Sequence, residues 1–127
     1  KKIFKNFHDF TIVQDDATNM SFPDETFTSV SCANAIHSIP QYPLALKEIY
    51  RVLKNEGTLR INVLTPPQGF LRSVSQRINK WGMKKGILQS PIDEVSFLNE
   101  LQAINLKVLQ KKKVGNCLFI LAQKQQV

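Results

Sequence analysis

Residues 43–64 contain the pattern that most limits the fold, because a helix with one apolar face is followed there by an alternating strand. Four apolar residues recur at helical spacing and form a single stripe, and these are Ala45, Ile49, Val52 and Leu53. Pro43 suits the first helical turn, and Gly57 offers a left-handed stop. Three apolar residues then alternate along a strand over residues 58–64, namely Leu59, Ile61 and Val63. A helix and a strand that each need one face covered predict a layered fold.

Further strands and helices are expected on both sides of this unit. Strand-like segments ending at turn residues precede it, over residues 10–14 and 28–33. A basic amphipathic helix is expected over residues 69–86, and another from a Ser90 cap to Asn105. Strands that alternate with helices favour an α/β sheet with parallel strands.

The C-terminal segment is predicted to form an antiparallel hairpin. Its arms cover residues 106–114 and 117–123, with Gly115-Asn116 as the turn. Residues 118–121 are apolar on both faces, which is typical of an interior strand covered on both sides. The sheet is therefore expected to be parallel at first and to be closed by this hairpin.

The net charge of +7 and the two cysteines narrow the class of protein. A basic chain suits an anionic partner such as nucleic acid, but a basic solvated surface is the favoured interpretation. Cys32 and Cys117 lie in apolar segments without metal-ligand spacing, so we expect reduced thiols, a cytoplasmic location and no metal site. No apolar run has the length of a membrane span.

Three sequence blocks carry a family resemblance through their order and spacing. They are DATNMSFPDETF at residues 16–27, VSCANAIHSI at residues 30–39 and ALKEIYRVLKNEGTL at residues 45–59. Together they resemble the class I S-adenosylmethionine-dependent methyltransferases, and in particular the group that includes the quinone-biosynthesis enzymes. The resemblance implies a Rossmann-like sheet of seven strands with helices on both faces. Strands three to seven would lie here, with the last strand antiparallel and interior.

The resemblance extends over nearly the whole chain, so residues 1–127 would form a partial methyltransferase domain. The core match covers residues 10–64, and a variable region on the substrate side covers residues 65–90. The C-terminal helix and hairpin cover residues 91–124. An exposed inner sheet edge in such a domain favours self-association.

The resemblance also implies where the cofactor S-adenosylmethionine binds. The Asp16 carboxylate would accept a hydrogen bond from the adenine amine, and the Ala17 amide would face a ring nitrogen. Backbone groups of Ala33 and Asn34 would approach the methionine amino group or the sulfonium. The alternative for Asn34 is a plain turn after a strand, whereas Asp15 is expected only to cap a turn. His37 is a minor candidate for a general base, because a single histidine is more often structural.

Some features depart from the family pattern. The family holds the methionine end of its cofactor with a G-x-G-x-G loop, and no two of the five glycines here are separated by one residue. Thr28 stands where an acidic residue is usual, and Arg60 and Asn62 share a strand face that is partly open or near the crevice. This chain alone is therefore expected to be inactive.

Three functions remain open from the sequence. The favoured one is methyl transfer to a small-molecule acceptor, performed as part of a longer chain. The second is a non-catalytic interaction module derived from a methyltransferase, which the departures from the family favour. The third is an RNA methyltransferase, suggested by the basic side chains of residues 72–85.

Overall fold

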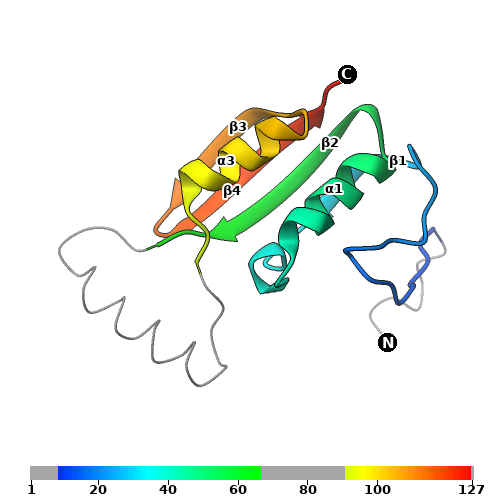
Figure 1. The fold of residues 1–127 in the computed structure, drawn as a ribbon, viewed down its shortest axis with the longest axis horizontal. Helices are drawn as coiled ribbons and strands as arrows, with labels where there is room; N and C mark the ends of the chain where they lie inside the picture. The colour runs from blue at the N-terminus through cyan, green and yellow to red at the C-terminus, as the bar shows by residue number, and fades with distance from the viewer. Residues whose placement is uncertain (1–8, 67–90, 127) are drawn as a thin grey trace.

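The computed structural model describes residues 9–66 and 91–126, and these form one four-stranded sheet with two α-helices (Figure 1). The elements in chain order are β1 (Phe27–Cys32), the 3-10 helix η2 (Ile36–Ser38), α1 (Tyr42–Val52), β2 (Leu53–Leu64), α3 (Glu94–Ala103), β3 (Leu106–Val114) and β4 (Cys117–Lys124). The strand order is β1-β2-β4-β3, with β1 parallel to β2 and β4 antiparallel to both neighbours. The predicted α/β class and the interior last strand are confirmed.

Helices α1 and α3 pack on the same face of the sheet (Figure 1). The alternating residues of β2 and β4 that meet them are at most 4% exposed, and these are Leu59, Ile61, Val63, Leu118, Ile120 and Ala122. The helices contribute fully buried side chains such as Leu46 and Phe97. Removal of these apolar surfaces from water is the main stabilising force for such a layered arrangement.

The opposite face of the sheet carries polar and partly exposed side chains. Arg60 is exposed there, and Phe119 on β4 is 46% exposed, so no described element covers the second side of β4. The prediction that residues 118–121 are covered on both faces is therefore not met within residues 9–66 and 91–126. The open face inferred from Arg60 and Asn62 agrees with this arrangement. No helix in the same described ranges is long and apolar enough to cross a membrane.

The strand predicted over residues 10–14 is wrong, because these residues are extended coil. A strand needs a neighbour for its backbone hydrogen bonds. Among the described residues the edge strand β1 pairs only with β2, and no strand runs beside residues 10–14. Ile12 and Val13 are consequently 73% and 55% exposed.

The end of α1 also differs from the prediction. The helix ends at Val52, and the next residue is already extended. Its last carbonyls accept hydrogen bonds from distant donors: Arg51 O from Glu25 N at 2.9 Å, Val52 O from Thr26 N at 2.8 Å and Leu53 O from Lys124 Nζ at 2.7 Å. The left-handed residue is Glu56, with φ of 66°, rather than Gly57. Tertiary contacts therefore terminate this helix instead of a glycine.

Helix α3 begins later than the sequence predicts. Its N-cap is Asp93, whose carboxylate accepts a hydrogen bond from Ser96 N at 3.0 Å, so the expected Ser90 cap is wrong. Its end is confirmed, since Asn105 adopts a left-handed φ of 64° directly after the helix. The hairpin of β3 and β4 is confirmed with Gly115-Asn116 as its turn. The basic helix predicted over residues 69–86 lies outside the described residues.

Gly57 is required for space rather than for its dihedral angles, which gives a first prediction. Gly57→Ala should cost about 1–3 kcal/mol of stability, because the added methyl would meet backbone at close range. An added Cβ would lie 2.8 Å from Lys54 O and 3.2 Å from Thr28 O. Urea denaturation followed by circular dichroism measures the loss.

Gly115→Asn is the matched control for this prediction. Gly115 has a φ of 62°, which Asn tolerates, and a Cβ there would meet nothing within 4 Å. A loss of stability for Gly57→Ala no larger than that for Gly115→Asn would contradict the steric argument.

Candidate functional site

The predicted adenine side of the cofactor site is a closed polar turn over residues 15–21. The Asp15 carboxylate accepts hydrogen bonds from Ser21 N at 2.8 Å and Ser21 Oγ at 2.9 Å. Asp16 Oδ1 accepts from Thr18 N at 2.8 Å and from Thr18 Oγ1 at 2.7 Å, while Asp16 O accepts from Asn19 N at 3.0 Å. Both carboxylates therefore organise the turn, which is the role expected for Asp15.

Asp16 retains capacity for a ligand beyond this turn role. Its side chain is exposed, and no hydrogen bond from residues 9–66 or 91–126 occupies Oδ2. Ala17, beside it, is half-buried and packs against the core, as does Met20 at the other end of the turn. The turn is thus packed on the core at Ala17 and Met20, and the exposed Asp16 side chain lies directly before the first of these residues.

Hydrogen bonds lower the pKa of both turn carboxyls. Ser21, through its backbone amide and then its hydroxyl, holds the pKa of Asp15 below its usual value of 3.8. Thr18, through its hydroxyl and then its amide, does the same for the pKa of Asp16. Hydrogen bonds to the charged form of a carboxyl favour that form. The turn is therefore an anionic structure at neutral pH.

The second predicted part of the site follows β1 at its carboxyl end. Asn34 adopts a left-handed φ of 54°, which Asn tolerates better than most residues. A pair of hydrogen bonds fixes it to β2: Asn34 N donates to Asn62 Oδ1 at 3.0 Å, and Asn62 Nδ2 donates to Asn34 Oδ1 at 2.6 Å. Asn62 is only 7% exposed, and its Nδ2 also lies 3.5 Å from Cys117 Sγ. The Asn62 side chain on β2 thus fixes the turn at Asn34 through two hydrogen bonds.

Asn62 is an unusual polar residue on a strand, and its sequence pattern alone did not assign it to the site. The pattern still contained a clue, because a buried amide needs hydrogen-bond partners and residues at the open end of a sheet can supply them. The structure joins Asn34 and Asn62, whereas no hydrogen bond among the described residues links this pair to Asp16 or Ala17.

A cavity of about 740 Å³ lies on the open face of the sheet, and Ala33 and Asn62 are among its lining residues. The other lining side chains come from all four strands and include Ser31, Arg60, Lys112 and Phe119. Asp16, Ala17 and Asn34 do not line it. The structure therefore brings Ala33 into a cavity with basic residues and leaves the Asp16 turn outside it.

His37 lies in η2 and is half-buried. Its Nδ1 is buried without a hydrogen-bond partner among the described residues. No hydrogen bond or ion pair joins it to an acidic residue within residues 9–66 and 91–126, so a role as general base stays a prediction. Both cysteines are free, as expected, and burial raises the pKa of the Cys32 thiol.

Comparison with known proteins shows which proteins this arrangement is similar to. Residues 1–61 match the family described as a methyltransferase domain. The putative methyltransferase of Bacillus halodurans superposes with a TM-score of 0.74, at 18% identity, over 89% of this chain and 71% of that protein. The first half of the chain is therefore similar in sequence to a methyltransferase domain, and the described residues have the Rossmann-like fold of solved methyltransferases, so the resemblance is confirmed.

A curated relative gives a closer sequence match over a shorter region. The demethylmenaquinone methyltransferase of Anoxybacillus flavithermus is 38% identical over 53 residues, which cover 42% of this chain and 22% of the relative. The chain thus spans about a fifth of the relative in this match. A solved [4+2]-cyclase also shares the fold, with a TM-score of 0.70 and 14% identity over 88% of this chain and 54% of that one. The fold by itself does not define the reaction.

The lowered pKa values of the turn carboxyls predict an acid transition local to this turn. A depressed carboxyl pKa stabilises the turn above the unfolded value of 3.8, and the contribution is lost as pH falls through the lower folded values. NMR should show the amide signals of Thr18 and Ser21 moving with midpoints below pH 3.8, while amides of β2 and β4 stay in place. Midpoints at or above 3.8 would contradict the hydrogen-bonded turn.

The Asn34–Asn62 pair predicts a measurable coupling between a residue in the turn after β1 and a residue on β2. Asn62→Ala should cost about 1–3 kcal/mol, because it leaves Asn34 N without its partner. Asn34→Gly keeps the left-handed backbone and removes only the side chain. A double-mutant cycle in urea should give a coupling of about 1 kcal/mol between the two sites, and additive effects would show that the pair is not formed.

Proposed function

We propose that the protein is an S-adenosylmethionine-dependent methyltransferase in which the described residues bind the adenine end of the cofactor. The observation that carries this proposal is the closed turn over residues 15–21, in which the exposed Asp16 side chain accepts hydrogen bonds from described residues through Oδ1 only. Asp16 and Ala17 begin the first family block. An exposed carboxylate oxygen can accept a hydrogen bond from the adenine amine, and the neighbouring backbone amide can donate to a ring nitrogen.

Methyl transfer from S-adenosylmethionine requires few catalytic side chains in this part of the chain. S-adenosylmethionine supplies a methyl group already activated by its sulfonium, so alignment provides much of the rate. The turn at Asp16 would bind the adenine, and backbone at Ala33 would lie beside the methionine end, next to the cavity on the open face. The glycine-rich contacts that the family makes are absent from the 127 residues, so activity is proposed for the complete gene product.

The proposed acceptor is a small molecule. The name of the relative from Anoxybacillus flavithermus states that it methylates demethylmenaquinone, and the shared region corresponds to the cofactor side in our assignment. This supports methyl transfer as the reaction class, whereas a quinone acceptor would be selected by other residues. The two unpaired cysteines suit a reducing compartment, and we propose the cytoplasm as the place of work.

The proposal is tested by calorimetric titration of the complete gene product with S-adenosylhomocysteine. Asp16→Asn should weaken binding about tenfold, because the amide Nδ2 that replaces Oδ2 is a donor and cannot accept from the adenine amine. Asn keeps the acceptor that bonds Thr18, so the turn itself should persist. Asp9→Asn is the matched control, since Asp9 is an exposed acid outside the turn.

The inosine analogue of the same ligand sharpens this test. It carries a carbonyl oxygen in place of the adenine amine, so the wild-type protein should bind it more weakly than the adenosine compound. Asp16→Asn should reduce that discrimination, and Asp9→Asn should not. Absence of binding by the wild-type protein would overturn the proposed function and favour a non-catalytic module.

A further inference from the structure

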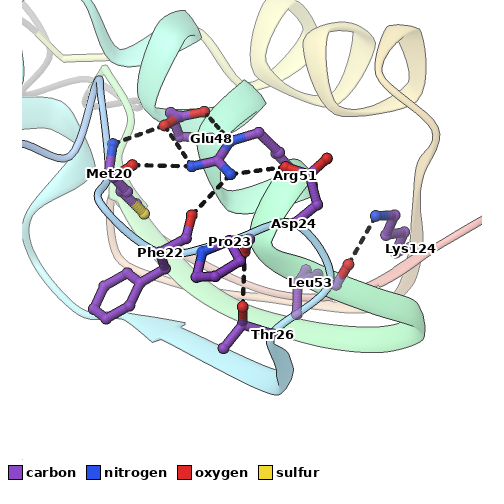
Figure 2. A network of polar contacts seen from close by, with 9 residues as sticks. All are labelled: Met20, Phe22, Pro23, Asp24, Thr26, Glu48, Arg51, Leu53 and Lys124. Atoms are coloured by element: carbon purple, nitrogen blue, oxygen red, sulfur yellow. Dashed lines mark hydrogen bonds and ion pairs between the residues drawn. The ribbon is translucent and has the colours of Figure 1, made fainter.

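Arg51 makes an unusually complete set of contacts for a side chain that is 31% exposed (Figure 2). It lies in the last turn of α1, and its guanidinium bonds the carboxylate of Glu48 through Nε at 2.7 Å and Nη2 at 3.0 Å. Nη1 donates to Asp24 Oδ1 and Phe22 O, both at 2.8 Å, and Nη2 donates to Met20 O at 3.0 Å. One side chain on the helix thus holds three residues of the preceding loop.

Glu48 completes the attachment, because it contacts both Arg51 and the loop. Its Oε1 accepts a hydrogen bond from Met20 N at 2.7 Å (Figure 2). Both backbone polar groups of Met20 are therefore bonded to this pair, N to Glu48 and O to Arg51. Glu48 and Arg51 thus provide hydrogen-bond partners for the backbone N–H and C=O groups of Met20, as a neighbouring strand would, although Met20 lies in no strand.

This attachment continues directly into the turn that carries Asp16. Ser21, the next residue after Met20, donates twice to the Asp15 carboxylate and so closes the turn. On the other side the loop is bonded to the end of α1 through Glu25 N and Thr26 N. The loop is consequently fixed to the last turns of α1 at both ends, and α1 is itself anchored by buried residues such as Ile49.

The contacts of Arg51 fix the loop more through the geometry of its hydrogen bonds than through the energy of its ion pairs. An exposed ion pair contributes about 0–1 kcal/mol, so Arg51 adds little to global stability through Glu48 and Asp24 alone. Two of its donors reach backbone carbonyls, however, and the planar fork of a guanidinium fixes several acceptors in one orientation. A lysine at this position could not reproduce that fork.

We propose that Arg51 and Glu48 are positioning residues for the cofactor, which hold the Asp16–Ala17 turn ready to accept an adenine ring. The inference rests on the proposed function. Neither residue contacts the ligand; they act through Met20 and Ser21. A preorganised loop loses less conformational freedom when a ligand binds, so the pair raises affinity without adding a contact. Arg51 also lies in the last turn of α1, where a cation suits the helix dipole.

The test compares Arg51→Met and Arg51→Lys with Lys47→Met in the complete gene product. Lys47 is exposed on the same helix and makes no hydrogen bond among the described residues, so Lys47→Met is the matched control. Arg51→Met should weaken binding of S-adenosylhomocysteine about tenfold and reduce discrimination against the inosine analogue. Arg51→Lys should restore part of the affinity, and Lys47→Met should behave as wild type.

Hydrogen exchange supplies a readout that does not need the ligand. Arg51→Met should speed amide exchange over residues 20–26 while exchange in β2 and β4 stays at the wild-type rate. The proposal is overturned if the wild-type protein binds the ligand and Arg51→Met retains both affinity and discrimination. It is also overturned if exchange over residues 20–26 does not change. If the wild-type protein binds no ligand, the proposed function fails first and this inference fails with it.

Discussion

The burial of one face of β2 and β4 beneath α1 and α3 is the constraint on which the rest of the structure depends. It fixes α1 beside the sheet, and α1 then supplies Glu48 and Arg51 to the loop before β1. The parallel pairing of β1 with β2 sends both strands toward the same edge, where Asn62 meets Asn34. The two halves of the candidate site are thus placed by one apolar core, although no described hydrogen bond joins them.

The sequence predicted elements whose pattern is complete within a few residues. The apolar stripe of α1, the alternation in β2 and the turn at Gly115-Asn116 are such patterns, and the structure confirms all three. Residues 10–14 have an equally good strand pattern but no neighbouring strand among the described residues. A strand forms only where a neighbouring strand can accept and donate its backbone hydrogen bonds. A local sequence pattern cannot reveal whether that neighbour is present.

Site roles that depend on partners close in the sequence were predicted, and roles that depend on distant partners were not. Asp16 and Ala17 belong to a recognisable block, and their turn is closed by Thr18 and Ser21 a few positions away. The role of Asn62 depends on Asn34, which is 28 residues distant, and that of Arg51 on Met20, which is 31 residues distant. The same distance effect explains α1, whose end is capped by Thr26 and Lys124 rather than by Gly57. Side-chain contacts across such separations follow from packing, which no short pattern encodes.

The fold alone leaves the reaction open, since a [4+2]-cyclase shares it. A cofactor site within such a fold depends on a small set of groups that contact the ligand, and the turn proposed for that role is held by two sets of contacts. Within the turn, hydrogen bonds from Ser21 lower the pKa of Asp15, and those from Thr18 lower the pKa of Asp16 against the repulsion from Asp15. Outside it, Arg51 and Glu48 hold the backbone that closes the turn. Because Met20 packs against the core, its part-buried backbone groups need protein partners, and Glu48 and Arg51 supply them. The same contacts fix the residue that precedes Ser21, so the requirement to satisfy a part-buried backbone also sets the position of the turn that carries Asp16.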